Sequence, residues 1–318
     1  TWKPYNSNNC LKITVNKKLK NIVGIRQLNV PARKNVELDG YIYLRSNTNT
    51  AGKIIVGLRS TKTGAIYAEH EISNITTDWE RYPFRLKPEN SDPDAEFFIV
   101  TRDRGTYYLD QVSLMPMKNR TGLPFRDDIL EAVRNLKPTI IRWPGGCFAT
   151  HYNWLDGIGT VDQRPVRPAF DWHGMGGSEP NTLGTDEYIL FCRELDAEPF
   201  IVLNVGVGHS VLRHNDGIEK ELGYFIDHAL NWIEYCNGPA DSEWGSLRAV
   251  NGYPEPYNVK VWGIDNELWG DWYAQVEAKF CDAIRDKYPD LMLVAVGSNP
   301  AGIWSFGSRF SFQAPLTP

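Results

Sequence analysis

The sequence predicts a multidomain β plus α/β protein, in which a β-sandwich over 1–117 precedes an incomplete TIM (β/α)8 barrel over 118–318. The first part alternates polar and apolar residues in short segments separated by turn-forming residues, which is typical of antiparallel sheets. The second part alternates apolar runs with amphipathic stretches of helical period, which is typical of parallel sheets covered by helices. A chain of 318 residues is long enough for two such domains.

Five predicted strands define the sandwich, and they cover residues 11–15, 41–45, 53–58, 95–100 and 107–114. Turn clusters such as 47–50 and 89–93 separate them, and no helical period intervenes. Strands at this spacing predict an antiparallel sandwich of the jelly-roll type. No combination of catalytic side chains stands out in this part, so we interpret it as an accessory module for packing or for sugar binding.

The second part begins with a helix over 126–136, which Lys137-Pro138 ends. The apolar run at 139–143 predicts the first strand and leads into Pro144-Gly145-Gly146. Further helices are expected at 182–195, 225–236 and 272–288, and further strands at 197–206, 259–267 and 291–297. Polar loops follow the strand ends, which favours a barrel over an open sheet. Because a closed (β/α)8 barrel needs about eight strands, the predicted barrel is incomplete.

The composition argues against several classes of function. A net charge of −5 provides no basic face, so we expect no nucleic-acid partner. No apolar run has the length of a membrane span, so we expect no membrane insertion. The five scattered cysteines and six histidines show no ligand spacing, so no metal, cofactor or disulfide framework is predicted. Cys192, Cys236 and Cys281 lie among apolar helical residues and are predicted to be core thiols.

The N-terminus, Thr1-Trp2-Lys3-Pro4, has neither an initiator Met nor an apolar signal core. We interpret this as a removed leader or as a start inside a longer protein. An extracellular or periplasmic location is favoured if a signal peptide precedes Thr1. The 11 Trp and 15 Tyr suit stacking on sugar rings, although aromatic residues also fill cores.

One apolar run carries the strongest functional signal, because residues 259–267 form a short strand that stops at Asn266-Glu267. In a β/α barrel, the carboxyl ends of the strands carry the active site. The neighbours of Glu267 are apolar or aromatic: Trp262, Leu268 and Trp269. Such surroundings favour a protonated carboxyl, which a general acid requires. The alternative is a strand that ends in a solvated glutamate.

Several further motifs follow one another along the chain. They are 142–148 (RWPGGCF), 153–159 (NWLDGIG), 163–165 (QRP), 183–188 (LGTDEY), 244–249 (WGSLRA), 254–256 (PEP) and 263–267 (GIDNE). In this order they resemble glycoside hydrolase family 51, the α-L-arabinofuranosidases. Upstream, Leu109–Pro116 resembles the end of the carbohydrate-binding-type sandwich of many members. The resemblance covers nearly the whole chain and assigns its second part to about strands two to five of the barrel.

The resemblance implies a retaining hydrolase that releases terminal α-L-arabinofuranosyl residues from arabinoxylan, arabinan and their oligosaccharides. It implies that Glu267 is the general acid/base and that Asn266 binds the sugar 2-hydroxyl. It also implies that Arg142 orients the nucleophile and that Cys147 lines the arabinofuranose pocket. Retaining hydrolysis needs a protonated carboxyl to assist the leaving group and a second carboxylate, about 5 Å away, to attack the anomeric carbon.

Each candidate substrate-binding residue also fits a structural role. Arg142 fits an ion-pair partner at a strand end, and Cys147 fits a small core residue. Asn204, at the end of the strand over 197–206, is a pocket residue or a turn former. Trp154 and Trp269 are sugar platforms or core residues.

The sequence departs from the family in its acidic residues. Family members carry a nucleophilic glutamate on a late barrel strand, whereas 291–318 contain neither Asp nor Glu. We therefore expect that the nucleophile is not in this chain, that the first barrel strand is also missing, and that the polypeptide alone has little activity. A β-1,4-endoglucanase of the same family and a non-catalytic carbohydrate-binding protein are the alternatives, and a homo-oligomer is left open.

Overall fold

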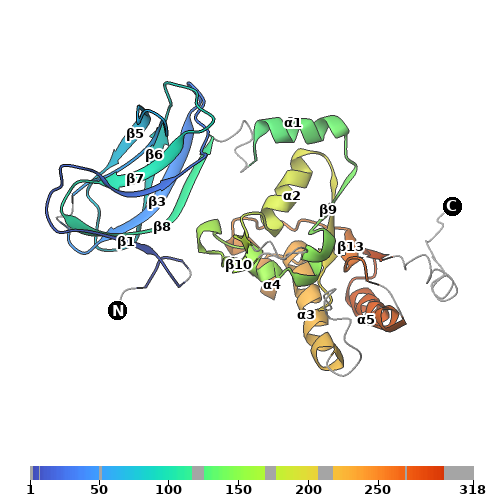
Figure 1. Ribbon diagram of the computed structural model, residues 1–318. Coiled ribbons are helices and arrows are strands. Elements are labelled where there is room, and N and C mark those ends of the chain that lie inside the picture. Colours follow the sequence, from blue (N-terminus) through green and yellow to red (C-terminus); the bar gives the residue numbers. More distant parts are fainter. Residues whose placement is uncertain are drawn as a thin grey trace. The chain divides into compact units, whose positions relative to one another are not determined.

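The computed structural model describes residues 3–6, 8–49, 52–116, 125–168, 177–206, 218–268 and 271–296 (Figure 1). The chain divides into two compact units, Thr1–Ile129 and Leu130–Pro318. The predicted boundary between residues 117 and 118 lies outside the described residues, so it remains a prediction.

The first unit consists of two four-stranded antiparallel sheets that share one core. One sheet has the order β1 (Leu11–Val15), β8 (Gly105–Pro116), β3 (Leu38–Ser46) and β6 (Glu80–Leu86). The other has the order β2 (Val23–Gln27), β7 (Glu96–Thr101), β4 (Ile54–Arg59) and β5 (Ile66–Ile72). Alternate residues of β3 and β4, among them Leu44 and Val56, point inward and are fully buried. The predicted antiparallel sandwich is therefore present.

All five strands predicted for the first unit are confirmed, and three further strands escaped the sequence analysis. The strand β2 is mostly exposed, so only its pairing with β7 identifies it. The strands β5 and β6 carry charged residues on their outer faces, and β6 contains Pro83. These features weaken the apolar alternation on which strand prediction depends.

The second unit is built on a four-stranded parallel sheet with the order β14-β13-β12-β9. Its strands are β9 (Ile140–Trp143), β12 (Glu198–Leu203), β13 (Val261–Ile264) and β14 (Met292–Ala295). The helices are α1 (Asp127–Leu136), α2 (Thr185–Glu194), α3 (Ile218–Asn237), α4 (Glu243–Val250) and α5 (Asp271–Lys287). Every strand and helix predicted for this part is confirmed, with ends shifted by at most three residues, except that α3 begins seven residues earlier than predicted. Gly297 lies outside the described residues.

Short elements complete the second unit after β9. They are the 3-10 helices η1 (Gly146–His151), η2 (Trp154–Gly157) and η3 (Val161–Gln163) and a ribbon of β10 (Arg167–Pro168) and β11 (Ser178–Glu179). The sequence analysis also missed α4, which has only eight residues and includes a glycine. The core is rich in aromatic residues, and Trp154, Trp232 and Trp262 are fully buried in it. Cys192, Cys236 and Cys281 are buried there as predicted.

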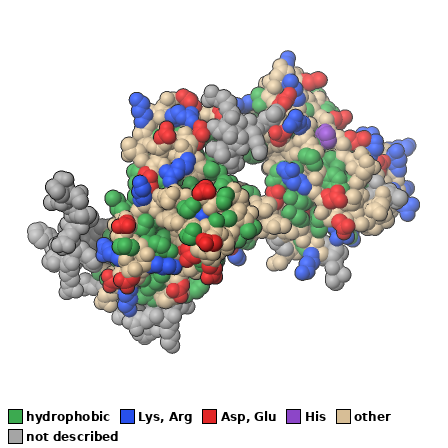
Figure 2. All heavy atoms as spheres, turned by 180° about the vertical axis from the view of Figure 1, so that it is seen from behind, with side chains coloured by type: hydrophobic (Ala, Val, Ile, Leu, Met, Phe, Trp, Pro, Cys, Tyr) green, Lys and Arg blue, Asp and Glu red, His purple; other side chains and the backbone are tan. Residues whose placement is uncertain are grey.

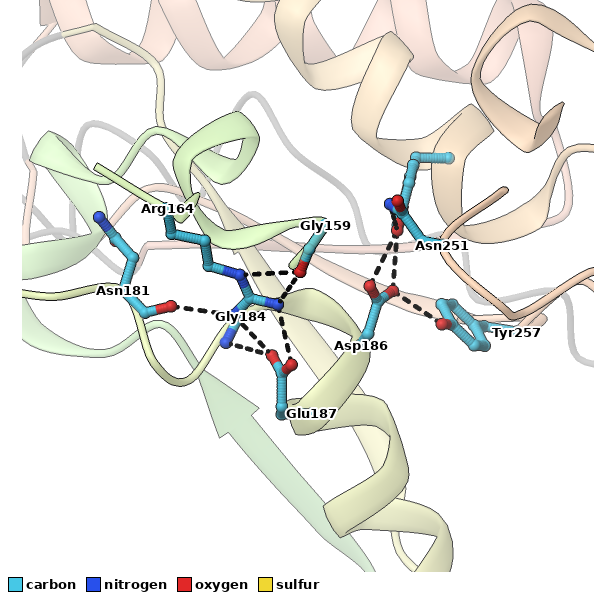
Figure 3. Close-up of polar contacts among 9 residues, drawn as sticks. Gly159, Arg164, Asn181, Gly184, Asp186, Glu187, Asn251 and Tyr257 are labelled. Atoms are coloured by element: carbon cyan, nitrogen blue, oxygen red, sulfur yellow. Dashed lines mark hydrogen bonds and ion pairs between the residues drawn. The ribbon is translucent and has the colours of Figure 1, made fainter. Parts of the chain in front are cut away.

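A buried ion pair ties the loop after η2 to the start of α2 (Figure 3). The guanidinium of Arg164 donates to both carboxylate oxygens of Glu187, at 2.8 and 2.9 Å. It also donates to the backbone oxygens of Gly159 and Asn181, both at 2.9 Å. Because Glu187 in turn accepts from the backbone N–H of Gly184, the pair fixes the loop on the first turn of the helix.

A second polar network lies beside the first (Figure 3). The carboxylate of Asp186 accepts from the hydroxyls of Tyr235 and Tyr257, at 2.9 and 2.7 Å. Arg248, which is fully buried, donates to four backbone carbonyls, including that of Tyr235. The motifs 163–165, 183–188 and 244–249 therefore supply interior polar groups that hold α2, α3 and α4 together.

The surface shows no charged stripe on the face drawn in Figure 2, where acidic and basic side chains are interspersed on both units. Among the described residues, no helix is long and apolar enough to cross a membrane. In the same residues, no group of three or more His, Cys, Asp or Glu side chains is arranged to hold a metal ion.

Candidate active site

The carboxyl ends of three parallel strands meet at one edge of the sheet in the second unit. The strand β9 is followed by Pro144-Gly145-Gly146 and η1, β12 by Asn204, and β13 by Asp265-Asn266-Glu267. Because β9, β12 and β13 are neighbours in parallel register, polar residues far apart in sequence come together there.

A chain of polar contacts links Arg142, Asn266, Cys147 and Glu267. The guanidinium of Arg142 donates to Asn266 Oδ1 at 2.6 Å. The Asn266 Nδ2 group lies 4.0 Å from Cys147 Sγ, and that sulfur lies 3.7 Å from Glu267 Oε2. The structure therefore brings together four of the residues that the sequence analysis selected.

The orientation of the Asn266 side chain follows from its partner. Arginine is a donor only, so it must face the oxygen of the amide and not its nitrogen. The Asn266 side chain is 5% exposed, which leaves little room for alternative rotamers. Its Nδ2 group is thereby directed to the side of Cys147 and Glu267 as a hydrogen-bond donor.

Cys147 is 1% exposed and lies beneath this edge of the sheet. Burial, together with the nearby Glu267 carboxylate, raises the pKa of the Cys147 thiol. The sulfur therefore stays protonated at neutral pH and donates its hydrogen to Glu267. A role for Cys147 in lining a sugar pocket remains a prediction, because the structure shows it chiefly as a buried contact of Glu267 and Asn266.

Among the described residues, the apolar neighbours expected around Glu267 are buried, whereas Glu267 itself is exposed. Its side chain is exposed, whereas Trp262 is fully buried and donates its indole N–H to the backbone oxygen of Val259. Leu268 is also buried, and Trp269 lies outside the described residues. Asp265 and Glu267 both have positive φ, at 63° and 51°, so the backbone is no longer extended at the end of β13.

Asn204 adopts the turn-forming role that was one of its two predicted alternatives. Its Oδ1 accepts from the backbone N–H of Gly206 at 2.7 Å, and its Nδ2 donates to the backbone oxygen of Tyr152 at 3.2 Å. Gly206 has a φ of 80°, which glycine adopts without strain. Direct contact of Asn204 with substrate remains a prediction.

Trp154 adopts the core role that was one of its two predicted alternatives. Its side chain is 0% exposed, its ring stacks on Trp232 with centroids 6.0 Å apart, and its indole N–H donates to the backbone oxygen of His228 at 3.1 Å. Its apolar faces and its donor are thus both used inside the core. The motif 153–159 did not reveal this, because buried and sugar-stacking tryptophans share the same sequence context of Gly, Asn and Asp.

Asp265 is a polar residue of this site that the sequence analysis missed. It is 2% exposed, and burial raises its pKa to about 7, although two backbone N–H groups and Arg142 act in the opposite direction. The signal in the sequence was an Asp placed directly after the apolar run 261–264. The sequence analysis selected only Asn266 and Glu267, the two residues that follow it.

The acidic residues after Glu267 that the structure describes lie on α5 or in the turn after it. Among them, Glu277 is buried on the helix, and this burial raises its pKa to about 6. A helix that follows a barrel strand covers the outside of the sheet, whereas reacting groups lie at the strand ends. None of these described carboxylates has the strand-end position of Glu267.

Comparisons with known proteins identify relatives of this chain. Residues 132–305 match the family described as the alpha-L-arabinofuranosidase 1 domain. Alpha-L-arabinofuranosidase C of Emericella nidulans is 38% identical over 210 residues, which are 63% of this chain and 38% of that protein. Alpha-L-arabinofuranosidase 1 of Arabidopsis thaliana is 31% identical over 265 residues, which are 80% of this chain and 38% of that protein.

Among solved structures, an arabinose-bound GH51 α-L-arabinofuranosidase superposes with a TM-score of 0.80 at 25% identity. The match covers 93% of this chain and 50% of that one. The matched part of the chain corresponds to 38% of the length of each of the two curated relatives, from Emericella nidulans and Arabidopsis thaliana. The family match over more than half of the residues, together with these relatives, shows that the chain belongs to the α-L-arabinofuranosidases of glycoside hydrolase family 51.

Proposed function

We propose that the site around Glu267 serves a retaining hydrolase that releases terminal α-L-arabinofuranosyl residues from arabinoxylan, arabinan and their oligosaccharides. The observation that carries the proposal is the chain of contacts from Arg142 through Asn266 and Cys147 to Glu267. It lies at the strand ends of the unit that matches the arabinofuranosidase family.

In this proposal Glu267 is the general acid/base. Its exposed carboxyl is accessible to a glycosidic oxygen, to which it delivers a proton as the bond breaks. In the second half-reaction the same group removes a proton from water. An exposed position suits an acid that must meet a polymer, because the leaving group extends into solvent.

Asn266 and Arg142 act together on the sugar. With its oxygen held by Arg142, the Asn266 amide presents its nitrogen as a donor to the 2-hydroxyl. A hydrogen bond to that hydroxyl strengthens as positive charge develops at the anomeric carbon, so it stabilises the transition state more than the ground state.

The nucleophile is proposed to lie outside these 318 residues. A retaining mechanism places two carboxyl groups about 5 Å apart. The described carboxylates after Glu267 belong to α5 and its following turn, and residues 291–318 contain no acidic side chain. The chain alone is therefore expected to bind arabinofuranosides but to turn them over only when another nucleophile is supplied.

An added nucleophile provides a direct test of the acid/base role. The purified chain is incubated with phenyl or 4-nitrophenyl α-L-arabinofuranoside, with and without sodium azide. Azide attacks the anomeric carbon from the face opposite the aglycone, so the expected product is the β-arabinofuranosyl azide. The phenol leaves with the proton that Glu267 delivers.

The variant Glu267→Gln separates acid catalysis from binding. Phenol is the poorer leaving group, so azide-dependent release of phenol should fall by about 100-fold or more, and release of 4-nitrophenol should fall much less. Glu255→Gln is the matched control, because Glu255 is an exposed glutamate in the loop that precedes β13. Equal losses for both substrates would contradict an acid role for Glu267.

Two further outcomes are decisive. Fast release of arabinose without azide would show that the chain does contain its nucleophile. Absence of both azide-dependent turnover and arabinofuranoside binding would overturn the proposed function. Cello-oligosaccharides serve as the counter-substrate, because an endoglucanase would bind them in preference to arabinofuranosides.

The first unit is proposed to be an accessory module of the carbohydrate-binding type over 1–117. Its tyrosines on the outer face of β3 are covered by neighbours within the unit. Tyr43 stacks on Tyr5 with centroids 3.7 Å apart, and the Arg81 guanidinium lies 3.9 Å from the centre of the Tyr41 ring. Because neighbouring side chains already stack on both rings, a packing role is favoured over sugar stacking at this face.

A further inference from the structure

Asp265 is a buried carboxyl group for which the proposed hydrolysis has no use. Its Oδ2 accepts from the backbone N–H of Val205 at 3.1 Å, and its Oδ1 accepts from the backbone N–H of Asn266 at 2.6 Å. The backbone N–H of Asp265 itself donates to Leu203 at 3.1 Å. One side chain thus joins the segment after β12 to the segment after β13.

These bonds hold a turn that is otherwise unfavourable. Asp265 and Glu267 are both in the left-handed region, at φ values of 63° and 51°. For a residue other than glycine, this conformation costs about 1–2 kcal/mol. Asp tolerates it better than most residues, because its short side chain can hydrogen-bond to the local backbone. The turn therefore depends on surrounding contacts, and the Asp265 carboxylate provides two of them.

Few charged or titratable groups face Asp265 from the described elements around it. Arg142 on β9 favours its ionised form. The charge of Asp265 also raises the pKa values of Cys147 on η1 and Tyr273 on α5, although burial contributes most to both increases. The residues Asn204-Val205 after β12 are uncharged. Burial opposes ionisation and places the pKa of Asp265 at about 7.

We propose that Asp265 is a positioning residue for Glu267. Its ionised carboxylate joins the ends of β12 and β13 and holds the turn that presents Asn266 and Glu267, and protonation loosens this turn. The reason is the number of acceptors, since both oxygens of a carboxylate accept N–H bonds fully, whereas a protonated carboxyl retains one full acceptor oxygen. One of the two backbone bonds, to Val205 or to Asn266, is then weakened.

The consequence for catalysis rests on the proposed function. A general acid must lie within hydrogen-bond reach of the glycosidic oxygen, and a displacement of about 1 Å can cost about 100-fold in rate. Loosening of the turn displaces Glu267 and Asn266 together, because both follow Asp265 directly. Turnover should therefore decrease as Asp265 becomes protonated, while the fold of the unit remains.

The positioning role is tested first without substrate. Backbone amide NMR signals of the full chain are followed from pH 5 to pH 9. In the unaltered chain, the amides of Val205, Asn266 and Glu267 should shift together with a common midpoint near the pKa of about 7. The variant Asp265→Asn has an isosteric side chain with one acceptor oxygen and no titrating group. All three signals should therefore stay constant with pH and match the low-pH form.

Three control variants identify the titrating group. Asp282→Asn alters an exposed aspartate on α5 and should leave the three titrations unchanged. Glu267→Gln and Cys147→Ser remove the other titratable groups of the site, and both should keep the midpoint. Loss of the titration in either of them, flat signals in the unaltered chain, or persistence of the titration in Asp265→Asn would overturn the proposal. If Asp265→Asn does not fold, the unaltered chain and these variants still decide it.

Azide-dependent turnover provides the second arm. At pH 8, Asp265→Asn should lower the release of phenol by about 10-fold to 100-fold, and at pH 6 the difference should narrow. If the amides titrate as expected but turnover at pH 8 is unaffected, Asp265 is structural only and the positioning role is rejected. If no variant binds or turns over arabinofuranosides, the proposed function fails, whereas the amide signals still decide whether Asp265 positions Glu267.

Discussion

At the scale of single residues, the described part of the candidate site is held together by hydrogen-bond donors and acceptors. Arg142 fixes Asn266, Cys147 lies beneath Glu267, and Asp265 joins two strand ends. In the proposed function Glu267 is an exposed acid, and this exposure fits a leaving group that belongs to a polymer. In this proposal Arg142, Cys147 and Asp265 support Asn266 and Glu267.

Removal of the Arg142 side chain tests how far this support matters. In Arg142→Ala, the Asn266 amide loses the partner that orients it, so its nitrogen no longer faces the sugar reliably. A hydrogen bond from a charged donor contributes about 1.5–3 kcal/mol, so arabinofuranoside binding measured by calorimetry should weaken by about 10-fold to 100-fold. Because Arg142 is exposed, the urea midpoint should change little. Unchanged affinity in a folded variant would show that Asn266 does not need Arg142.

The charge of Asp265 also makes a prediction for stability. The pKa is about 7 in the folded protein and about 4 in an unfolded chain. Between these values the folded state binds more protons than the unfolded state, so the free energy of unfolding contributed by Asp265 falls as pH rises from about 4 to about 7. The slope is about 1.4 kcal/mol per pH unit at most, and it vanishes above pH 8.

Chemical denaturation at several pH values gives the free energy of unfolding of the unaltered chain and of Asp265→Asn. The difference between the two values measures the contribution of Asp265. The difference should change between pH 4 and pH 7 and be constant from pH 8 upward. Glu277→Gln is a useful comparison, because the pKa of Glu277 is raised to about 6 and its slope should end about one pH unit lower. A difference that stays constant over the whole range would contradict the assigned charge of Asp265.

At the scale of secondary-structure elements, three of the seven motifs supply buried polar contacts of the scaffold. Arg164, Glu187, Asp186 and Arg248 come from three separate motifs and satisfy buried polar groups between loops and helices. They lie in the interior because buried backbone carbonyls and N–H groups at helix ends need partners. A resemblance built on such residues identifies the fold of the family more directly than its chemistry.

The ion pair between Arg164 and Glu187 should be important for stability. In Arg164→Ala, the mostly buried carboxylate of Glu187 loses its partner, and two backbone carbonyls lose their donor. Breaking one side of a buried pair costs about 3–5 kcal/mol. Arg167→Ala is the control, because the pair of Arg167 with Asp156 is largely exposed on the arginine side and should cost about 1 kcal/mol or less. Similar shifts of the urea midpoint for both variants would contradict the buried role of Arg164.

The order of elements could be predicted from the sequence because helical and strand periods are local. The helices α2, α3 and α5 and the strands β9, β12, β13 and β14 follow from apolar spacing alone. The sequence could not show the features that depend on tertiary contacts. One is the strand β2, whose residues are mostly exposed. Another is the burial of Asp265, which bonds to the segment after β12. The two alternatives for Trp154 stayed open for the same reason, since only packing distinguishes a core tryptophan from a surface platform.

At the scale of the whole molecule, two units carry separate cores of different composition. The core of the first unit is mainly aliphatic, with Ile42, Leu44 and Val56 fully or almost fully buried. The core of the second unit contains the tryptophans Trp154, Trp232 and Trp262. Indole fluorescence therefore reports mainly on the second unit, whereas far-ultraviolet circular dichroism reports on both. This difference allows the two units to be followed separately during unfolding.

Matched core truncations then test whether each core stabilises only its own unit. Leu44→Ala in the first unit and Ile233→Ala in the second each remove a fully buried aliphatic side chain, at a cost of about 2–5 kcal/mol. Because the cores share no buried residue, Leu44→Ala should lower the unfolding midpoint seen by circular dichroism and leave the tryptophan midpoint in place. Ile233→Ala should lower the tryptophan midpoint. If both variants shift both signals equally, the units unfold as one cooperative body, and substitutions in the first unit then act on the stability of the second unit as well.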